Sequence, residues 1–177
     1  MSDYVTRTAF AAAYDSLAAA EADYKTVKDL YYGLKLMDTF DAAVIQKQAD
    51  GKVKIIKRHE QPTIQGAWAG AGLGLAAGVV VACFPAAALG TGLLAASAGA
   101  GAISGALAGH VAGGMSRSDL KEIGESLDNG QAGLVVVAAT DVSARVSDSI
   151  KSAKKVVSKQ IKANEKEFKK ELDAASA

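Results

Sequence analysis

The stretch that decides how this chain is built is Gln61–Ser116, QPTIQGAWAGAGLGLAAGVVVACFPAAALGTGLLAASAGAGAISGALAGHVAGGMS. It contains no Asp, Glu, Lys or Arg, although 22% of the 177 residues are charged. Most of the chain's 18 glycines lie inside it. A charge-free window of this length is a distinct physical unit. It separates a first segment, 1–60, from a second, 117–140, and from a C-terminal segment, 141–177.

Glycine recurs at every fourth position in each half of the window, at Gly66, Gly70, Gly74 and Gly78 and again at Gly101, Gly105, Gly109 and Gly113. Phe84-Pro85 separates the halves, and proline breaks or kinks a helix. Four-residue spacing aligns the glycines in one groove of a helix, where another backbone can approach closely. Each helical glycine costs about 1 kcal/mol relative to alanine, so close packing must compensate. The spacing predicts a glycine-zipper helical hairpin over 61–116 that drives assembly into a homo-oligomer.

Two environments suit such a hairpin. Ile64–Cys83 provides twenty residues, which at about 1.5 Å each match a hydrocarbon core of about 30 Å. Membrane lipid is then a partner, and the lysines and arginines that flank both ends place the charged segments on the cytoplasmic side. Large apolar side chains are few, however. The alternative is a water-soluble oligomer or shell in which hairpins bury one another between subunits.

The flanking segments show the periodicities of strands and helices. Asp50-Gly51 predicts a tight turn between two strands, and Ser116 with Asp119 predicts a helix start. Residues 134–139 are apolar throughout, as in a strand covered on both faces. The expected elements are strands at 7–14, 41–49, 52–57 and 134–139 and helices at 17–34 and 117–128. Their order, β-α-β-β-α-β, predicts an α+β, ferredoxin-like domain with the hairpin inserted before the second helix.

The C-terminal segment predicts one long, lysine-rich amphipathic helix. From Val142 to Leu172 apolar residues recur about every 3.75 residues, which is close to an eleven-residue repeat. Lysines occupy much of the remaining surface. The helix therefore docks its apolar stripe on the domain or on a neighbouring molecule, or it lies on an anionic membrane surface.

The stretch Asp41–Ile55 (DAAVIQKQADGKVKI), the glycine-rich window and Leu120–Asp128 (LKEIGESLD) together resemble a known family. It is one of the domain-of-unknown-function families of small predicted bacterial membrane proteins. The resemblance extends over about 5–140, with the C-terminal segment as an extension beyond it. It implies a bacterial origin and membrane association. With the cationic flanks of the hairpin, the expected location is the cytoplasmic face of the bacterial inner membrane, and the alternative is a soluble assembly in the cytoplasm. The resemblance brings no catalytic residues with it.

Few residues suggest chemistry. His110 is the only imidazole within the window and is a candidate functional polar residue, because polar groups inside membranes often serve function. Cys83 is expected to be a small apolar residue at the hairpin tip. No metal or catalytic spacing is visible, so we expect no cofactor, no specific small molecule and no enzyme activity. A net charge of +1 gives no reason to expect nucleic acid binding.

Three classes of function follow. The first is a self-associating membrane protein with a scaffold, envelope-remodelling or stress role. The second is a soluble self-assembling particle. The third is a membrane-anchored, ligand-binding ferredoxin-like module.

Overall fold

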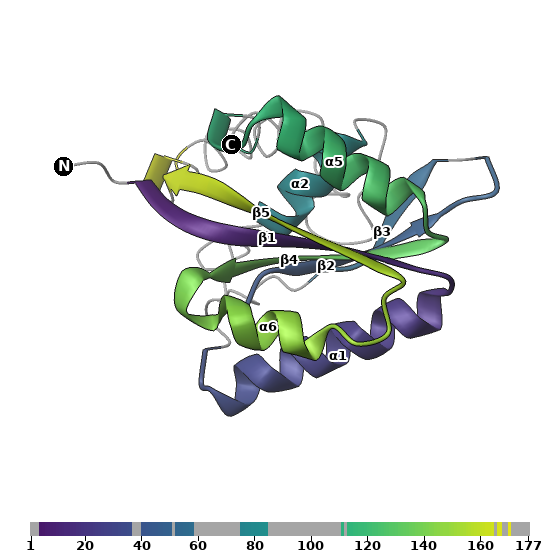
Figure 1. Ribbon diagram of the computed structural model, residues 1–177, viewed down its shortest axis with the longest axis horizontal. Helices are drawn as coiled ribbons and strands as arrows, with labels where there is room; N and C mark the ends of the chain where they lie inside the picture. Colours follow the sequence, from purple (N-terminus) through teal and green to yellow (C-terminus); the bar gives the residue numbers. More distant parts are fainter. Residues whose placement is uncertain are drawn as a thin grey trace.

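The fold has three layers, with helices on both faces of one sheet (Figure 1). The computed structural model describes residues 4–36, 40–50, 52–58, 75–84, 111, 113–164, 166, 167 and 170. In chain order its elements are β1 (Tyr4–Tyr14), α1 (Leu17–Gly33), β2 (Ala42–Lys47), β3 (Val53–Arg58), α2 (Leu75–Cys83), α5 (Arg117–Asp128), β4 (Ala132–Ala139), the 3₁₀ turn η2 (Thr140–Val142), α6 (Ser143–Ser149) and β5 (Lys155–Asn164).

The sheet has five strands in the order β3-β2-β4-β1-β5, and all neighbouring strands are antiparallel. β1 pairs with β4 from Arg7↔Ala139 to Tyr14↔Ala132 and with β5 along ten residues. β4 lies between β1 and β2, which α1 connects along the chain. β1 in turn lies between β4 and β5, which η2 and α6 connect. The sheet thus contains two split β-α-β units that share their central strands.

Each face of the sheet carries its own apolar core. On one face, α1 and α6 cover Phe10, Tyr14 and Leu134, and Tyr31 packs against Phe40 with ring centroids 5.0 Å apart. On the other face, α2 and α5 cover Ala11, Ile45 and other small or branched side chains. Alternation along the strands explains this division, because successive side chains point to opposite faces. A sheet buried on both faces is what the all-apolar β4 requires.

The local predictions for the flanking segments are confirmed. The four expected strands and two expected helices are present, each within a few residues of its predicted bounds. The α1 cap is Ser16, whose Oγ accepts a hydrogen bond from Ala19 N–H at 3.2 Å. Ser116 Oγ accepts one from Asp119 N–H at 3.1 Å at the start of α5. β2 and β3 form the expected hairpin, with Lys47 paired to Val53. The class is therefore α+β.

The predicted assignment of strands within the sheet is wrong. A ferredoxin-like order of the expected elements would place 52–57 beside 7–14. Instead β4 lies between β1 and β2, β5 takes the other side of β1, and β3 is the outermost strand. The reason is composition: β4 is buried along nearly its whole length, whereas Lys52 and Lys54 of the β3 segment are exposed. The strand that is apolar on both faces takes the central place, and the half-polar strand takes the edge.

The prediction of a single helix over 141–172 is also wrong. Only α6 is helical in its first part, and 155–164 form β5. Buried Ile161 alternates with exposed Gln160 and Lys162, a period of two that coexists with the helical spacing. Strand pairing decides between the helical and the extended conformation, because ten residues of β1 pair with this segment. The two conformations are separated at Ser152, whose N–H donates to buried Asp23 at 2.9 Å.

Only part of the glycine-rich window lies within the described residues. α2 is nine residues long, and 111, 113 and 114 are helical. Within the described part of the chain, no helix combines the length and apolar character that a membrane span needs. The predicted span Ile64–Cys83 ends in α2, whose residues Leu75, Val79 and Val80 are buried on the sheet. Those residues are therefore core residues of the α+β domain rather than the lipid-facing half of a hairpin.

The turn before β4 provides a first test. A Cβ on Gly130 would lie 2.7 Å from Ala132 O and 2.8 Å from Tyr14 O, both backbone atoms that cannot move cheaply. We expect Gly130→Ala to lower the free energy of unfolding by about 1–3 kcal/mol, measured by urea denaturation. Gly33→Ala is the matched control, because a Cβ there meets nothing within 4 Å. It should be neutral or stabilise by up to about 1 kcal/mol. Equal losses for both variants would contradict the close approach at Gly130.

Candidate functional site

The most distinctive site is the place where the glycine-rich window joins the sheet. Asp41, just before β2, is only 4% exposed. Its carboxylate accepts hydrogen bonds from Leu75 N–H at 2.9 Å (Oδ2) and from Ala76 N–H at 3.2 Å (Oδ1). Its own carbonyl accepts a bond from Val137 N–H at 2.9 Å. One residue thus joins β2, β4 and the start of α2.

The chemistry of this contact is that of a helix cap supplied from a distance. The first N–H groups of a helix have no partner within it, and the N-terminus carries partial positive charge. A carboxylate that accepts two of these N–H groups satisfies both requirements. Burial removes competition from water, so the contact holds α2 in one position on the sheet. Asp41 and Leu75 are 34 residues apart, so no local sequence pattern indicates this contact.

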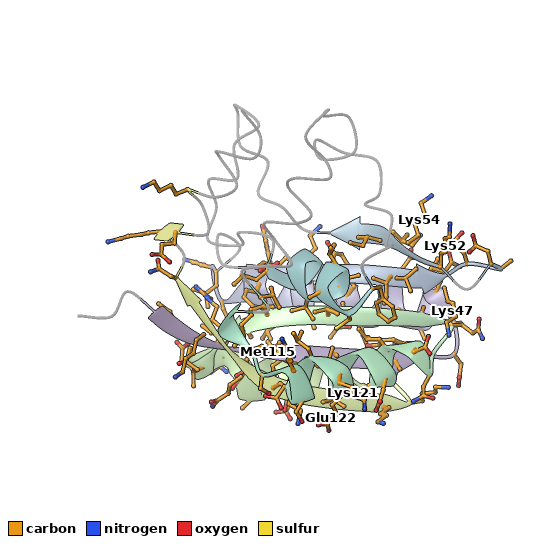
Figure 2. The ribbon with its side chains drawn as sticks, turned by 90° about the horizontal axis from the view of Figure 1, so that it is seen from above. Lys47, Lys52, Lys54, Met115, Lys121 and Glu122 are labelled. Atoms are coloured by element: carbon orange, nitrogen blue, oxygen red, sulfur yellow. The ribbon has the colours of Figure 1, made fainter. Side chains whose placement is uncertain are left out.

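Apolar contacts complete the anchor. Leu75, Ala76, Val79 and Val80 are at most 1% exposed and share a core cluster with Ile45, Ile123 and Val135. Val111 and Met115, at the end of the window, belong to the same cluster. Figure 2 looks onto this face and shows Met115 near the sheet, with Glu122 on the side of α5 away from α2. Both α2 and the end of the window are therefore fixed to the sheet.

Gly114 makes the closest approach at the end of the window. A Cβ at this position would overlap the carbonyl oxygen of Lys162 in β5 and would lie 3.3 Å from Ile161 Cγ1. Only glycine fits there, because the obstacle is backbone. Gly114 lies outside the four-residue repeat, so the periodicity gave no signal for it. The window therefore ends in contact with the backbone of β5.

A groove of about 400 Å³ opens between the end of α2 and α5. Apolar and charged groups line it together: Ala82, Cys83, Phe84, Leu120, Lys121, Gly124, Glu125 and Asp128. Cys83 Sγ lies 3.5 Å from Leu120 O, as a weak thiol donor would. Burial raises the pKa of the Cys83 thiol to about 11. The thiol is therefore protonated at neutral pH, which is the opposite of what a nucleophile needs.

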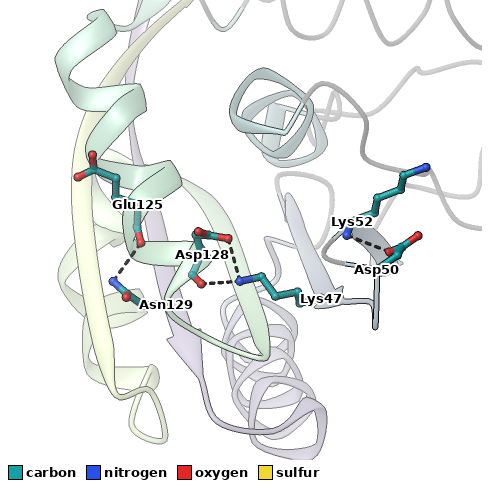
Figure 3. A network of polar contacts seen from close by, with 6 residues as sticks. All are labelled: Lys47, Asp50, Lys52, Glu125, Asp128 and Asn129. Atoms are coloured by element: carbon teal, nitrogen blue, oxygen red, sulfur yellow. Dashed lines mark hydrogen bonds and ion pairs between the residues drawn. The ribbon is translucent and has the colours of Figure 1, made fainter.

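The far end of α5 is held by a cation. Lys47 Nζ lies 2.8 Å from both Asp128 O and Asp128 Oδ1 (Figure 3). A positive charge at a helix C-terminus is favourable. Asn129 Nδ2 donates to Glu125 O at 3.1 Å, and Asp50 Oδ1 accepts from Lys52 N–H at 3.0 Å in the β2–β3 turn. The Lys47–Asp128 contact joins the hairpin to α5 near the groove, and the other two contacts are local to the end of α5 and to the turn.

Tyr31 lies on the opposite face, within the electrostatic influence of the Asp41 carboxylate. Its pKa is raised to about 12, first by burial and then by the negative charges of Asp41 and Asp141. The positive charge of Arg7 acts in the opposite direction. Tyr31 Oη is buried and has no hydrogen-bond partner among the residues that the structure describes. The phenol is neutral throughout the physiological range and has no obvious acid–base role.

Only some of the predicted site residues lie within the described part of the chain. Gly66, Gly70, Gly74, Gly101, Gly105, Gly109 and His110 lie outside the described residues. Gly78 is buried within α2, where it contributes to the sheet-facing helix. Gly113 is exposed, and a Cβ there would meet nothing within 4 Å. At Gly113, therefore, no described backbone approaches closely. Among the described residues no three His, Cys, Asp or Glu side chains are grouped to hold a metal ion.

One known protein family matches this chain. A family described as protein of unknown function, DUF1269, matches residues 67–173. The chain belongs to this family. The DUF1269 match includes α2, α5, β4, α6 and β5, and it begins after β3. The C-terminal segment is therefore part of the family domain, and the prediction that it extends beyond it is wrong. No curated protein and no solved structure matches the chain.

The Asp41 contact leads to a second prediction. Asp41→Ala leaves two buried N–H groups of α2 without their acceptor, so we expect the free energy of unfolding to fall by about 2 kcal/mol or more. Hydrogen exchange of the Leu75 and Ala76 amides should accelerate, by at least as much as that of the amides in any other helix or strand. Asp29→Ala is the control, because Asp29 is exposed and, within the described part of the chain, its ion pair is with Lys25 on the same helix. If Asp41→Ala is as stable as Asp29→Ala, Asp41 does not anchor α2.

The alkylation rate of Cys83 provides a third test, of the same contact between Asp41 and α2. Because burial raises its pKa to about 11, alkylation at pH 8 should be on the order of 100-fold slower than in the urea-unfolded chain. In Asp41→Ala, release of α2 should increase the rate in the folded protein. The measurement is iodoacetamide labelling followed by mass spectrometry. Rapid labelling of the wild-type chain would show that the thiol is not buried between α2 and α5.

Proposed function

We propose that this protein is a non-enzymatic, self-associating scaffold in which the α+β domain presents the glycine-rich window for assembly. The observation that carries the proposal is the buried Asp41 contact, together with the apolar seat of α2. It fixes the middle of the window to a folded domain, so that the charge-free stretches on either side of α2 start from defined positions. The repeated glycines at 66–74 and 101–109 support close helix–helix contact.

Membrane association is part of this proposal. The charge-free stretches, the cationic residues that flank them and the resemblance to small bacterial membrane proteins support a site at the cytoplasmic face of a bacterial inner membrane. Lipid would be the partner and the homo-oligomer the working form. A water-soluble assembly, in which copies bury one another's glycine-rich segments, is the outcome that competes with it.

A second candidate is a ligand-binding module. The groove between α2 and α5 supports it, because a site with apolar walls and a few charged groups suits a small organic molecule. The domain would then be a ferredoxin-like core built from β1-α1-β2 and β4-α6-β5, with β3 and the window as additions. The relative order β2-β4-β1-β5 supports this description.

The test uses two glycines of the runs, one from each half of the window. Gly70→Leu and Gly105→Leu each place a large side chain in a glycine groove, so the assembled mass measured by light scattering should fall. Gly33→Leu is the control, because Gly33 has open space around it and lies outside the window. Unchanged mass in both window variants would contradict assembly through the glycine runs.

A carbonate wash of membranes from expressing cells distinguishes the environments. Wild-type protein that stays in the pellet and requires detergent supports the membrane proposal. Protein that stays in the supernatant as a large particle, and dissociates in the two leucine variants, supports the water-soluble assembly instead.

A further inference from the structure

A second groove lies between α6 and β5, on the face of the sheet that α1 and α6 cover. Its volume is about 350 Å³, and every residue that lines it belongs to the described part of the chain. Figure 1 shows α6 below β5, on the side of the sheet opposite α5 and α2. The sheet therefore separates this groove from α2 and from the groove beside α2.

Strand pairing builds the floor of the groove. Thr8 is paired with Gln160, and Phe10 is paired with Ser158, across β1 and β5. Paired residues share a face of the sheet, so these four side chains lie together on the α6 side. Phe10 is only 4% exposed and belongs to the core under α6, so it supplies an apolar base. Ser158 and Gln160 are exposed, so α6 leaves this side of β5 open.

The helix supplies the facing wall. Ser143 and Ser147 are one turn apart in α6, and both line the groove together with Ala144. Hydroxyl groups from the helix therefore face hydroxyl and amide groups from the two strands. The result is a groove with polar walls and an apolar base.

Most of these polar side chains have unused hydrogen-bonding capacity. Four of them form no side-chain hydrogen bond with any described residue: Thr8, Ser147, Ser158 and Gln160. Ser143 Oγ donates to Thr140 O at 2.9 Å and keeps its acceptor lone pairs. A hydroxyl both donates and accepts, and a glutamine amide has two donors and one acceptor. The groove thus presents neutral donors and acceptors together.

The groove offers no charge to a ligand. Lys159 lines it, but the Lys159 Nζ lies on the other face of the sheet, 2.6 Å from Glu122 and 3.6 Å from Asp119 of α5. The remaining lining residues are uncharged. A charged ligand would lose part of its hydration here without gaining an opposite charge. The lining therefore favours an uncharged ligand.

We infer that the groove between α6 and β5 binds an uncharged, hydroxyl-rich ligand of the size of a mono- or disaccharide. Sugar hydroxyls donate and accept hydrogen bonds as the lining does, and the carbon–hydrogen face of a sugar ring suits Phe10 and Ala144. The volume lies near the lower end of the range of about 300–1,000 Å³ that is typical of ligand pockets, which limits the size. The inference is independent of the glycine-rich window and of the proposed assembly.

The test uses the full-length protein, with glucose and maltose as neutral probes. Isothermal titration calorimetry should give a dissociation constant on the order of 1 mM, because the ligand displaces water from exposed polar groups. Hydrogen exchange followed by mass spectrometry should show protection in 143–147 and 158–160 and none in α5. Glucose 6-phosphate, which is anionic, and glucosamine at pH 6, which is cationic, should both bind more weakly than glucose.

Two variants of the groove should weaken binding. Ser158→Ala with Gln160→Ala removes two sets of unused hydrogen-bonding groups from exposed positions, and the dissociation constant for maltose should rise at least fivefold. Ala144→Leu places a larger side chain in the groove at an exposed helical position and should abolish binding. Circular dichroism checks that each variant is folded. Either variant decides the question if the other fails to fold.

Matched controls make the same changes elsewhere. Ser118→Ala with Gln131→Ala removes the same chemical groups at exposed positions outside the groove, and Ala22→Leu enlarges an exposed alanine of α1. Both should leave binding unchanged. The inference is overturned if neither neutral sugar binds at tens of millimolar, if the charged sugars bind as well as glucose, or if the controls weaken binding as much as the groove variants. Protection located outside the groove would overturn it as well.

Discussion

The structure depends on one constraint: β4 and β1 are central strands that must be covered on both faces. β4 is apolar from Ala132 to Ala139, and seven of its eight residues are buried. β1 places Phe10 and Tyr14 on one face and Ala9 and Ala11 on the other. A pair of strands like this cannot face water on either side without exposing most of the core. Helices from distant parts of the chain are therefore required above and below.

That requirement explains where the glycine-rich window goes. α1 and α6, the connections between neighbouring strands, cover one face. The other face is covered by α5 and by α2, and α2 comes from the middle of the charge-free window. A segment without charged residues is a natural cover for an apolar sheet. The Asp41 carboxylate adds direction, because it determines which end of α2 lies at the start of β2.

How far the sequence predicts this fold depends on the range of the interactions involved. Elements defined by local signals were predictable: the Ser116 cap, the hairpin around Asp50, and the apolar run of β4. The order of strands was not, because the choice between β3 and β4 as the strand that lies between β1 and β2 depends on burial of both faces at once. β5 was mistaken for a helix because its apolar spacing fits both a helical and a strand period, and pairing with the edge of β1 makes it a strand.

Of the residues at the candidate site, only the repeated glycines were indicated by a sequence pattern. Asp41 and Gly114 act through backbone groups 34 and 48 positions away, which no spacing rule reports.

The contact of Gly114 with the backbone of Lys162 has a thermodynamic consequence. The end of the window and the edge strand share an atom-to-atom boundary that allows no intervening side chain. Any event that shifts β5 must move the exit of the window, and any displacement of the window must strain β5. Two surfaces on different parts of the domain are therefore energetically linked, and the coupling free energy is reciprocal: the effect of the window's position on β5 equals the effect of β5's position on the window.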